Sequence, residues 1–114
     1  MTRIRVEREQ GAVVVTAGGE LDAFNAEELA AALGEAGDGN VGRLVIDLGR
    51  VSFLDSTALG LVVRTMKETV DRGGHARLVL PETSARRIFE ITTLDRVLPV
   101  APSREDALID LASD

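Results

Sequence analysis

The sequence contains no cysteine, tryptophan or tyrosine, and only three phenylalanines, three prolines and one histidine among its 114 residues. Without cysteine the chain has no disulfide and no thiolate ligand for a metal, which fits a reducing compartment. One histidine also offers no histidine pair for a metal ion. The scarcity of aromatic side chains argues against a stacking surface for single-stranded nucleic acid. The sequence therefore predicts no metal and no cofactor.

Long apolar runs and basic clusters are lacking as well. No apolar stretch approaches the roughly 20 residues that cross a bilayer, and the N-terminus lacks the apolar segment of a signal peptide. The formal net charge is −6, with acidic and basic residues well mixed. This balance argues against non-specific binding to nucleic acid or to anionic lipid. We therefore expect a cytoplasmic protein that does not insert into membranes and does not bind nucleic acid.

Apolar periodicity predicts one α/β domain over residues 1–114. Strands are expected at residues 4–8, 12–17, 43–48, 76–80 and 97–100. Helices are expected after Asn25, over 59–70, over 84–91 and after Ser103. This alternation favours right-handed crossovers and a mixed, mainly parallel sheet of about five strands flanked by about four helices. The first strand is expected to be antiparallel, because Gln10-Gly11 is a tight-turn pair.

Several residues mark the expected boundaries and faces of these elements. Gly18-Gly19 is expected to stop the second strand, and Gly73-Gly74 to end the helix over 59–70. Asp47 lies inside a strand pattern and is expected to face solvent or to bond to a cap. The buried faces of the first two helices are expected to comprise Leu29, Ala30, Leu33 and Ala36, and then Leu59, Val62, Val63, Met66 and Val70.

The most informative stretch is Phe53–Gly60, which reads Phe-Leu-Asp-Ser-Thr-Ala-Leu-Gly. It follows an apolar strand and opens an amphipathic run, so Ser56 and Thr57 are expected where a strand turns into a helix. The first turn of a helix has unpaired N–H groups and a partial positive charge, which suits a phosphate. A hydroxyl there is a candidate phosphorylation site. The plainer alternative is that Asp55 or Ser56 only caps the helix.

Three motifs in this chain resemble those of one family. Asp55-Ser56-Thr57-Ala58-Leu59-Gly60 resembles the signature of STAS domains, specifically the small bacterial anti-sigma factor antagonists. Gly19-Glu20-Leu21-Asp22 is similar to the second common motif of that family, and residues 86–97 are similar to its late helix and turn. The motifs stand in the expected order over nearly the whole chain. This resemblance implies a single STAS-like domain.

The chain departs from the family pattern at two positions. The family usually has glycine where Ala58 stands, and commonly has glycine where Thr93 stands. Alanine is comfortable in the first turn of a helix, so the change at Ala58 is expected to stiffen the helix start and alter the fit of a partner. The acceptor hydroxyl of Ser56 is not affected by either change.

The resemblance implies a partner-switching function without enzyme activity. The unphosphorylated protein would bind an anti-sigma factor of the serine-kinase type and release a sigma factor. That kinase would phosphorylate Ser56, with Thr57 as the fallback acceptor, and a separate phosphatase would reset the protein. The partner-binding face implied by the resemblance comprises Asp22, Asp55, Ser56, Thr57, Ala58 and Gly60.

Three other functions remain open at this stage. A STAS subunit of a membrane-lipid ABC transport complex would grip an ATPase through the same face, without phosphate on Ser56. A small serine hydrolase would use Ser56 as nucleophile and needs a nearby base. The only histidine, His75, is expected in a solvated turn, and no G-x-S-x-G motif is present. A purely structural scaffold would tolerate Ser56→Asp without losing any partner.

Overall fold

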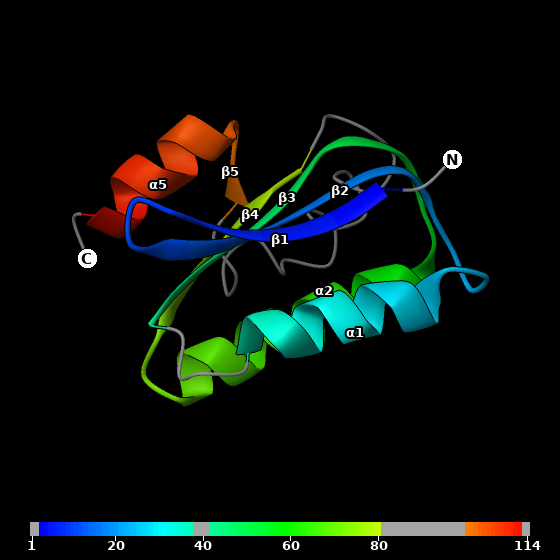
Figure 1. Cartoon of the computed structure of the whole chain (residues 1–114), viewed down its shortest axis with the longest axis horizontal. Coiled ribbons are helices and arrows are strands. Elements are labelled where there is room, and N and C mark those ends of the chain that lie inside the picture. The colour runs from blue at the N-terminus through cyan, green and yellow to red at the C-terminus, as the bar shows by residue number, and fades with distance from the viewer. Residues whose placement is uncertain (1–2, 38–41, 81–99, 113–114) are drawn as a thin grey trace.

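Five strands form one mixed sheet in the computed structural model, which describes residues 3–37, 42–80 and 100–112. The spatial order is β1-β2-β3-β4-β5, and β1 is antiparallel to β2 while the other neighbours are parallel (Figure 1). The strands are β1 (Arg3–Glu9), β2 (Ala12–Leu21), β3 (Arg43–Leu54), β4 (His75–Val79) and β5 (Val100–Ala101). The helices described are α1 (Ala26–Gly37), α2 (Ser56–Asp71) and α5 (Arg104–Ala112). The predicted fold class is confirmed.

A two-residue turn joins β1 to β2. Gln10 and Gly11 both have positive φ, 50° and 80°, and Glu9 pairs with Ala12 across the turn. Two-residue turns of this kind match the right-handed twist of the flanking strands, which is why they close antiparallel hairpins. The predicted turn and the predicted antiparallel first strand are both confirmed.

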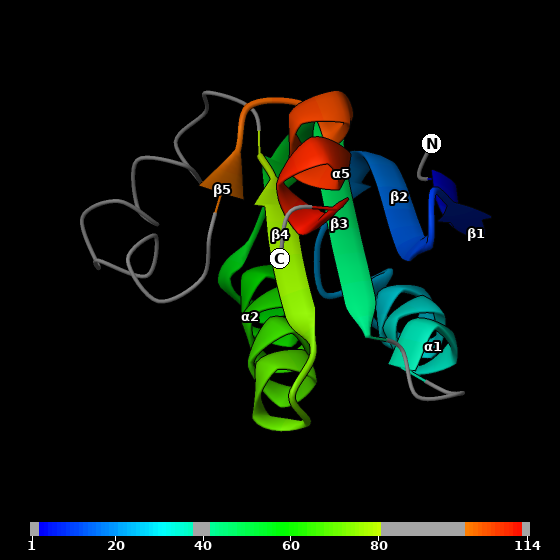
Figure 2. The ribbon, with the colours of Figure 1, turned by 90° about the vertical axis from the view of Figure 1, so that its left-hand side faces the viewer.

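Helices cover both faces of the sheet. Helices α1 and α2 lie side by side on one face, and α5 lies on the other (Figures 1 and 2). The larger core combines Leu29 of α1 and Met66 of α2 with Ile46 at the centre of the sheet, all 0% exposed. On the opposite face, Leu108 and Leu111 of α5 belong to a second apolar cluster with strand residues Val14, Val45 and Val79.

The helix faces differ from the sequence prediction in detail. Ala30 is exposed, while Ala32 takes the buried position in α1. In α2, Val62 and Met66 are buried, Leu59 and Val63 are half-buried, and Val70 is exposed. The packing of α2 against the sheet and α1 therefore buries a narrower stripe than periodicity alone suggests, because only one edge of the apolar face reaches the core.

Strands β2 and β3 both run further than predicted. Gly18-Gly19 does not stop β2, which continues to Leu21, and β3 continues past Leu48 to Leu54. The pairing of the two strands shifts register between Thr16 and Gly18 and again between Gly19 and Glu20. Gly19 has a φ of 84°, a conformation that glycine adopts without the steric penalty of a side chain. Glycine thus allows irregular pairing here instead of ending the strand.

The helix boundaries agree with the predicted caps. Helix α2 begins at Ser56, earlier than Leu59, and Gly73 ends it with a φ of 85° and a hydrogen bond of 2.9 Å from its N–H to the Val70 carbonyl. Helix α5 follows Ser103, whose Oγ accepts the Asp106 N–H at 3.1 Å. The predicted helix over 84–91 and the motif over 86–97, with Thr93, lie outside the described residues.

Candidate functional site

The candidate site lies where β2 and β3 end side by side. Leu21 pairs with Leu54, and the Asp55 N–H donates to the Leu21 carbonyl at 3.0 Å. This bond joins the start of the Phe53–Gly60 motif to the end of β2, where Asp22 follows. The carboxyl ends of parallel strands are the usual place for binding sites in α/β sheets. Two of the sequence motifs, far apart in the chain, therefore meet at one edge.

Asp55 is the N-cap of α2. Its backbone is extended (φ −88°, ψ 175°), its carbonyl accepts the Leu59 N–H at 3.0 Å, and its Oδ1 accepts the Ala58 N–H at 2.9 Å. This arrangement decides between the two capping alternatives: Asp55 caps and Ser56 does not. Ser56 and Thr57 are both exposed in the first helical turn, and their hydroxyls form no hydrogen bond within the described residues.

Ala58 and Gly60 have opposite environments. Ala58 is 0% exposed and packs into the larger core, so its side chain supports the helix start from below and lies off the surface. A methyl group fits there, which explains how alanine is accommodated at a position where the family usually has glycine. Gly60 is exposed, and a Cβ added to it would have no atom within 4 Å. Nothing packed against Gly60 within the described chain requires glycine.

Asp22 belongs to a hydrogen-bonded loop between β2 and α1. Its Oδ1 accepts the Phe24 N–H at 2.9 Å, and its own N–H donates to Asn25 Oδ1 at 2.9 Å. The Asn25 side-chain amide donates to the Glu20 carbonyl at 2.6 Å. An aspartate that bonds to its own loop is a common turn device. Here it also holds one loop shape beside the start of α2.

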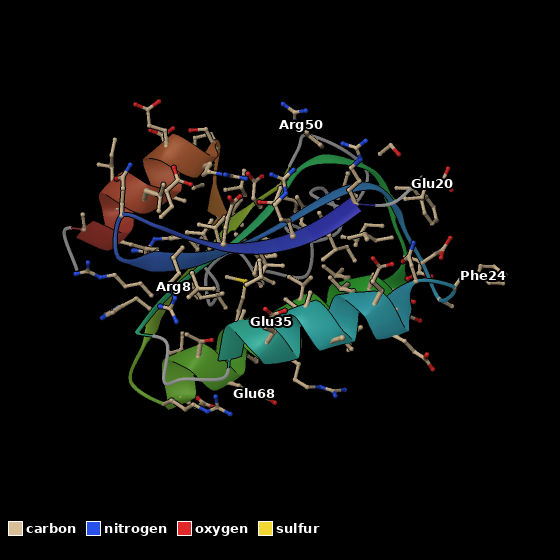
Figure 3. All side chains as sticks on the ribbon, in the orientation of Figure 1. Arg8, Glu20, Phe24, Glu35, Arg50 and Glu68 are labelled. Atoms are coloured by element: carbon tan, nitrogen blue, oxygen red, sulfur yellow. The ribbon has the colours of Figure 1, made fainter. Side chains whose placement is uncertain are left out.

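Two aromatic side chains for which the sequence predicts no role are exposed at this end of the molecule. Phe24, at the tip of the Asp22 loop, is 99% exposed and points away from the protein (Figure 3). Phe53, which pairs with Glu20, is 52% exposed. The sequence offered one signal for Phe24. It lies in a polar segment, Asp22-Ala23-Phe24-Asn25, outside any apolar pattern that would bury its side chain.

A shallow groove runs along α2 from the candidate phosphorylation site. It has a volume of about 540 Å³, begins at Ser56 and extends to Asp71.

 Half-buried Leu59 and Val63 form the apolar part of this groove, with Gly60 between them and Lys67 further along the helix. The apolar stripe of α2 thus serves two surfaces, since Val62 and Met66 enter the core while Leu59 and Val63 remain partly accessible.

Asp47 neither faces solvent nor bonds to a helix cap, the two roles that the sequence suggested. Its side chain is 14% exposed; Oδ1 accepts the Gly49 N–H at 2.9 Å and Oδ2 accepts from Arg104 Nε at 2.9 Å. Arg104 also lies 3.3 Å from Glu9 and 3.5 Å from Glu7, and it donates to Thr16 Oγ1. The expectation was wrong because this partner comes from α5, and no local pattern reveals a contact that distant in sequence.

The carboxylates of Asp47, Glu9 and Glu7 stabilise the charged form of Arg104. Partial burial alone lowers the pKa of Arg104, but the hydrogen bond to Asp47 and the charges of Asp47, Glu9 and Glu7 raise it. The net result is a pKa above the ordinary value for arginine. Arg104 therefore stays charged and ties α5 to three strands of the sheet.

His75 lies at the opposite end of the sheet from Ser56. It is exposed and begins β4, whereas Ser56 follows the end of β3, which runs parallel to β4. This placement removes histidine as the base that the hydrolase alternative needs. Within the described ranges no cluster of three or more potential metal ligands is found. Among the described helices, none is both long and apolar enough to cross a bilayer.

Comparisons with known proteins agree with this arrangement. The family model described as STAS domain matches residues 3–107. The anti-sigma-F factor antagonist RsfB of Mycobacterium tuberculosis is 31% identical over 105 residues, covering 92% of this chain and 85% of RsfB. The crystal structure of an anti-sigma factor antagonist from Mycobacterium paratuberculosis superposes with a TM-score of 0.89 at 31% identity, covering 98% of this chain and 95% of that one.

A second structural relative is known in two chemical states. SpoIIAA in its unphosphorylated form superposes with a TM-score of 0.74 at 26% identity, covering 97% of this chain and 98% of SpoIIAA. SpoIIAA of Bacillus in its phosphorylated form gives a TM-score of 0.74 at 28% identity, covering 95% of this chain and 98% of that one.

Proposed function

Because the chain belongs to the STAS-domain family of anti-sigma factor antagonists, we propose that it binds an anti-sigma factor of the serine-kinase type and releases a sigma factor. Phosphorylation of Ser56 ends the binding. The observation that carries this proposal is the exposed Ser56 hydroxyl in the first turn of α2, beside the loop of Asp22. Residues 1–114 act as one domain in the cytoplasm, without catalytic activity of their own.

The proposed switch works through charge on the surface. A phosphate adds about −1.5 to −2 charges and three acceptor oxygens at neutral pH. The N-terminal N–H groups of α2 attract it, while the Asp55 carboxylate repels it. Since Ser56 is exposed, the domain keeps its fold. A partner packed over Ser56 meets a hydrated dianion instead of a hydroxyl and loses its contacts.

Other proteins supply the chemistry of this cycle. The anti-sigma factor provides the ATP, the metal ion and the catalytic base for phosphorylation, and a separate phosphatase resets the protein. Thr57, exposed next to Ser56, is the fallback acceptor. The proposed partner-binding face contains Asp22, Asp55, Ser56, Thr57 and Gly60, and buried Ala58 supports it from the core side.

Affinity capture from the native host tests the proposal, with the Ser56→Ala variant as bait and Ser56→Asp as control. An ATP-binding anti-sigma factor retained by alanine and lost with aspartate is the expected result. A transporter ATPase held equally by both variants would favour the lipid-transport alternative instead.

Phe24 is expected to anchor the partner. An aromatic side chain that is 99% exposed on a hydrogen-bonded loop loses little freedom on binding and buries a large apolar area. Phe24→Ala is expected to weaken binding of the captured anti-sigma factor about tenfold, or about 1.4 kcal/mol, with no loss of thermal stability. Isothermal titration calorimetry measures the affinity.

Val70→Ala is the matched control for Phe24→Ala. Val70 is also exposed and apolar, at 47%, but lies near the far end of α2. It is expected to leave the affinity unchanged. An equal loss in the two variants, or none in Phe24→Ala, would contradict the anchor role.

Gly60→Ala is expected to change stability and binding in opposite directions. Alanine is favoured over glycine inside a helix by about 1 kcal/mol, and the added Cβ meets no atom within 4 Å. Denaturant unfolding should therefore show a more stable protein, while the methyl group obstructs a partner lying close to α2. A more stable variant that binds as tightly as the original would show that the partner does not approach Gly60.

A further inference from the structure

A second cavity lies on the other side of the sheet, away from Ser56 and the α2 groove. Helix α5 covers the part of this face formed by β3, β4 and β5, and none of the described helices covers the part over β1 and the end of β2 (Figure 1). A cavity of about 720 Å³ opens there, and its lining extends to Glu28 of α1, which covers the opposite face. Small-molecule sites typically occupy about 300 to 1,000 Å³. Its lining includes Arg3, Arg5 and Arg50, with Thr16 and Gly18 between them.

Strand pairing places two of these arginines on the same face. Arg5 pairs with Thr16, and Arg3 pairs with Gly18. Alternate residues of a strand share a face, so Arg3, Arg5 and Glu7 point to one side of β1. Glu7 and Thr16 both contact Arg104 of α5, which identifies that side as the α5 face.

An irregularity in the pairing brings the third arginine to this face. Thr16 pairs with Asp47 and Gly18 pairs with Arg50, so β3 has one more residue than β2 between the two pairs. In a regular strand Arg50 and Asp47 would lie on opposite faces; the extra residue returns Arg50 to the α5 face. A Cβ built on Gly18 would lie 3.5 Å from the Arg50 Cβ. Figure 3 shows Arg50 on the side of the sheet opposite α1 and α2.

The charges at this cavity leave the three arginines available. The side chains of Arg3, Arg5 and Arg50 form no hydrogen bond or ion pair within the described residues. Asp47 and Glu7 both contact Arg104, and the described lining as a whole carries four arginines against three carboxylates, those of Glu7, Glu28 and Asp47. Three available guanidinium groups at one cavity contrast with the net charge of −6 on the chain.

We propose that this cavity binds a small anion of the diphosphate class. The planar guanidinium group pairs with phosphate oxygens through two parallel hydrogen bonds, and several arginines suit an anion with several charges. Gly18 leaves the floor between the arginines open, and Thr16 adds a hydroxyl beside it. Among the described lining residues there is no aromatic side chain on which a nucleobase would stack, so the phosphate groups provide the recognition.

Titration of the whole protein with potassium pyrophosphate tests the proposal. Amide chemical shifts are followed by NMR at constant ionic strength, with chloride as the background anion. Saturable shifts at Arg5, Thr16, Gly18 and Arg50 are expected, with a Kd on the order of 0.1 to 1 mM. The double variant Arg5→Ala, Arg50→Ala is expected to bind at least about tenfold more weakly.

Two further variants separate charge from shape. Arg8→Ala removes an exposed arginine from the other face of β1, beside Val13 of the larger core, and is expected to bind pyrophosphate normally. Gly18→Val keeps every charge but fills the floor, and is expected to lose binding. The dispersion of the amide spectrum shows whether each variant is folded.

Linear shifts without saturation, or an equal loss in Arg8→Ala, would overturn the proposal. ADP is expected to bind no more tightly than pyrophosphate, and a clear gain with ADP would contradict recognition through phosphate alone. A hexaglutamate peptide that binds more tightly than pyrophosphate would assign the cavity to an acidic protein segment. Because Ser56 takes no part in these experiments, their outcome does not bear on the partner switch.

Discussion

Ser56→Asp is expected to lower the affinity for the anti-sigma factor at least about thirtyfold relative to Ser56→Ala, or about 2 kcal/mol. The carboxylate places a negative, hydrated group in the first turn of α2, where the partner is proposed to pack. The substitution leaves the fold around residue 56 unchanged, because Ser56 is exposed and the capping bond from the Ala58 N–H goes to Asp55. The loss therefore belongs to the interface. Phosphate, with its larger charge, is expected to have a larger effect than aspartate.

Calorimetric titration of both variants with the captured anti-sigma factor measures this effect. Thermal unfolding of each variant alone checks that the fold is unchanged. Val70→Asp is the matched control, since it introduces the same charge at an exposed position of α2 far from the proposed partner-binding face, and it is expected to leave the affinity unchanged. Incubation with the kinase and ATP followed by mass spectrometry identifies the acceptor, and phosphate on Thr57 alone would move the switch to the fallback residue. Equal affinities of Ser56→Ala and Ser56→Asp would refute the switch.

Arg104→Met is expected to reduce the free energy of unfolding by about 2 to 3 kcal/mol. Arg104 is the cation shared by Asp47, Glu7 and Glu9, and Asp47 is only 14% exposed. Removal of one partner leaves a largely buried carboxylate without its counter-charge, which costs about 3 to 5 kcal/mol for fully buried pairs. The Arg104 side chain is 30% exposed, so solvent reduces that value. Methionine keeps most of the aliphatic packing.

Urea unfolding measures the change, with Arg64→Met as the control for loss of an exposed positive charge from a helix. The control is expected to stay within about 0.5 kcal/mol of the original protein. A double-mutant cycle with Asp47→Asn isolates the pair, and a coupling energy of about 1 kcal/mol or more is expected. Independent, additive effects of the two substitutions would mean that the ion pair does not hold α5 to the sheet.

Local residue chemistry was enough to predict most elements of the sheet. Gln10-Gly11 specified a hairpin because one of its residues is glycine and the turn requires positive φ at both positions. Gly73 ended α2 for the same conformational reason. These features depend on a few consecutive residues, so a single sequence contains the information. The prediction failed at Gly18-Gly19, because glycine can either end a strand or allow irregular pairing within one. The pair suggested the end of β2, but both residues pair with β3 and the strand continues.

The candidate site divides in the same way. Sequence alone located Ser56 at a strand-to-helix junction and Asp22 after a strand, because capping and strand patterns are local. Tertiary structure decided that Asp55 caps the helix, that Ala58 is buried and that Phe24 is exposed beside them. It also decided that Asp47 contacts Arg104 and that the Arg50 side chain lies on the α5 face of the sheet. Each of these features depends on contacts between elements that are distant in the sequence. Such contacts are set by tertiary packing, so no local pattern of residues predicts them.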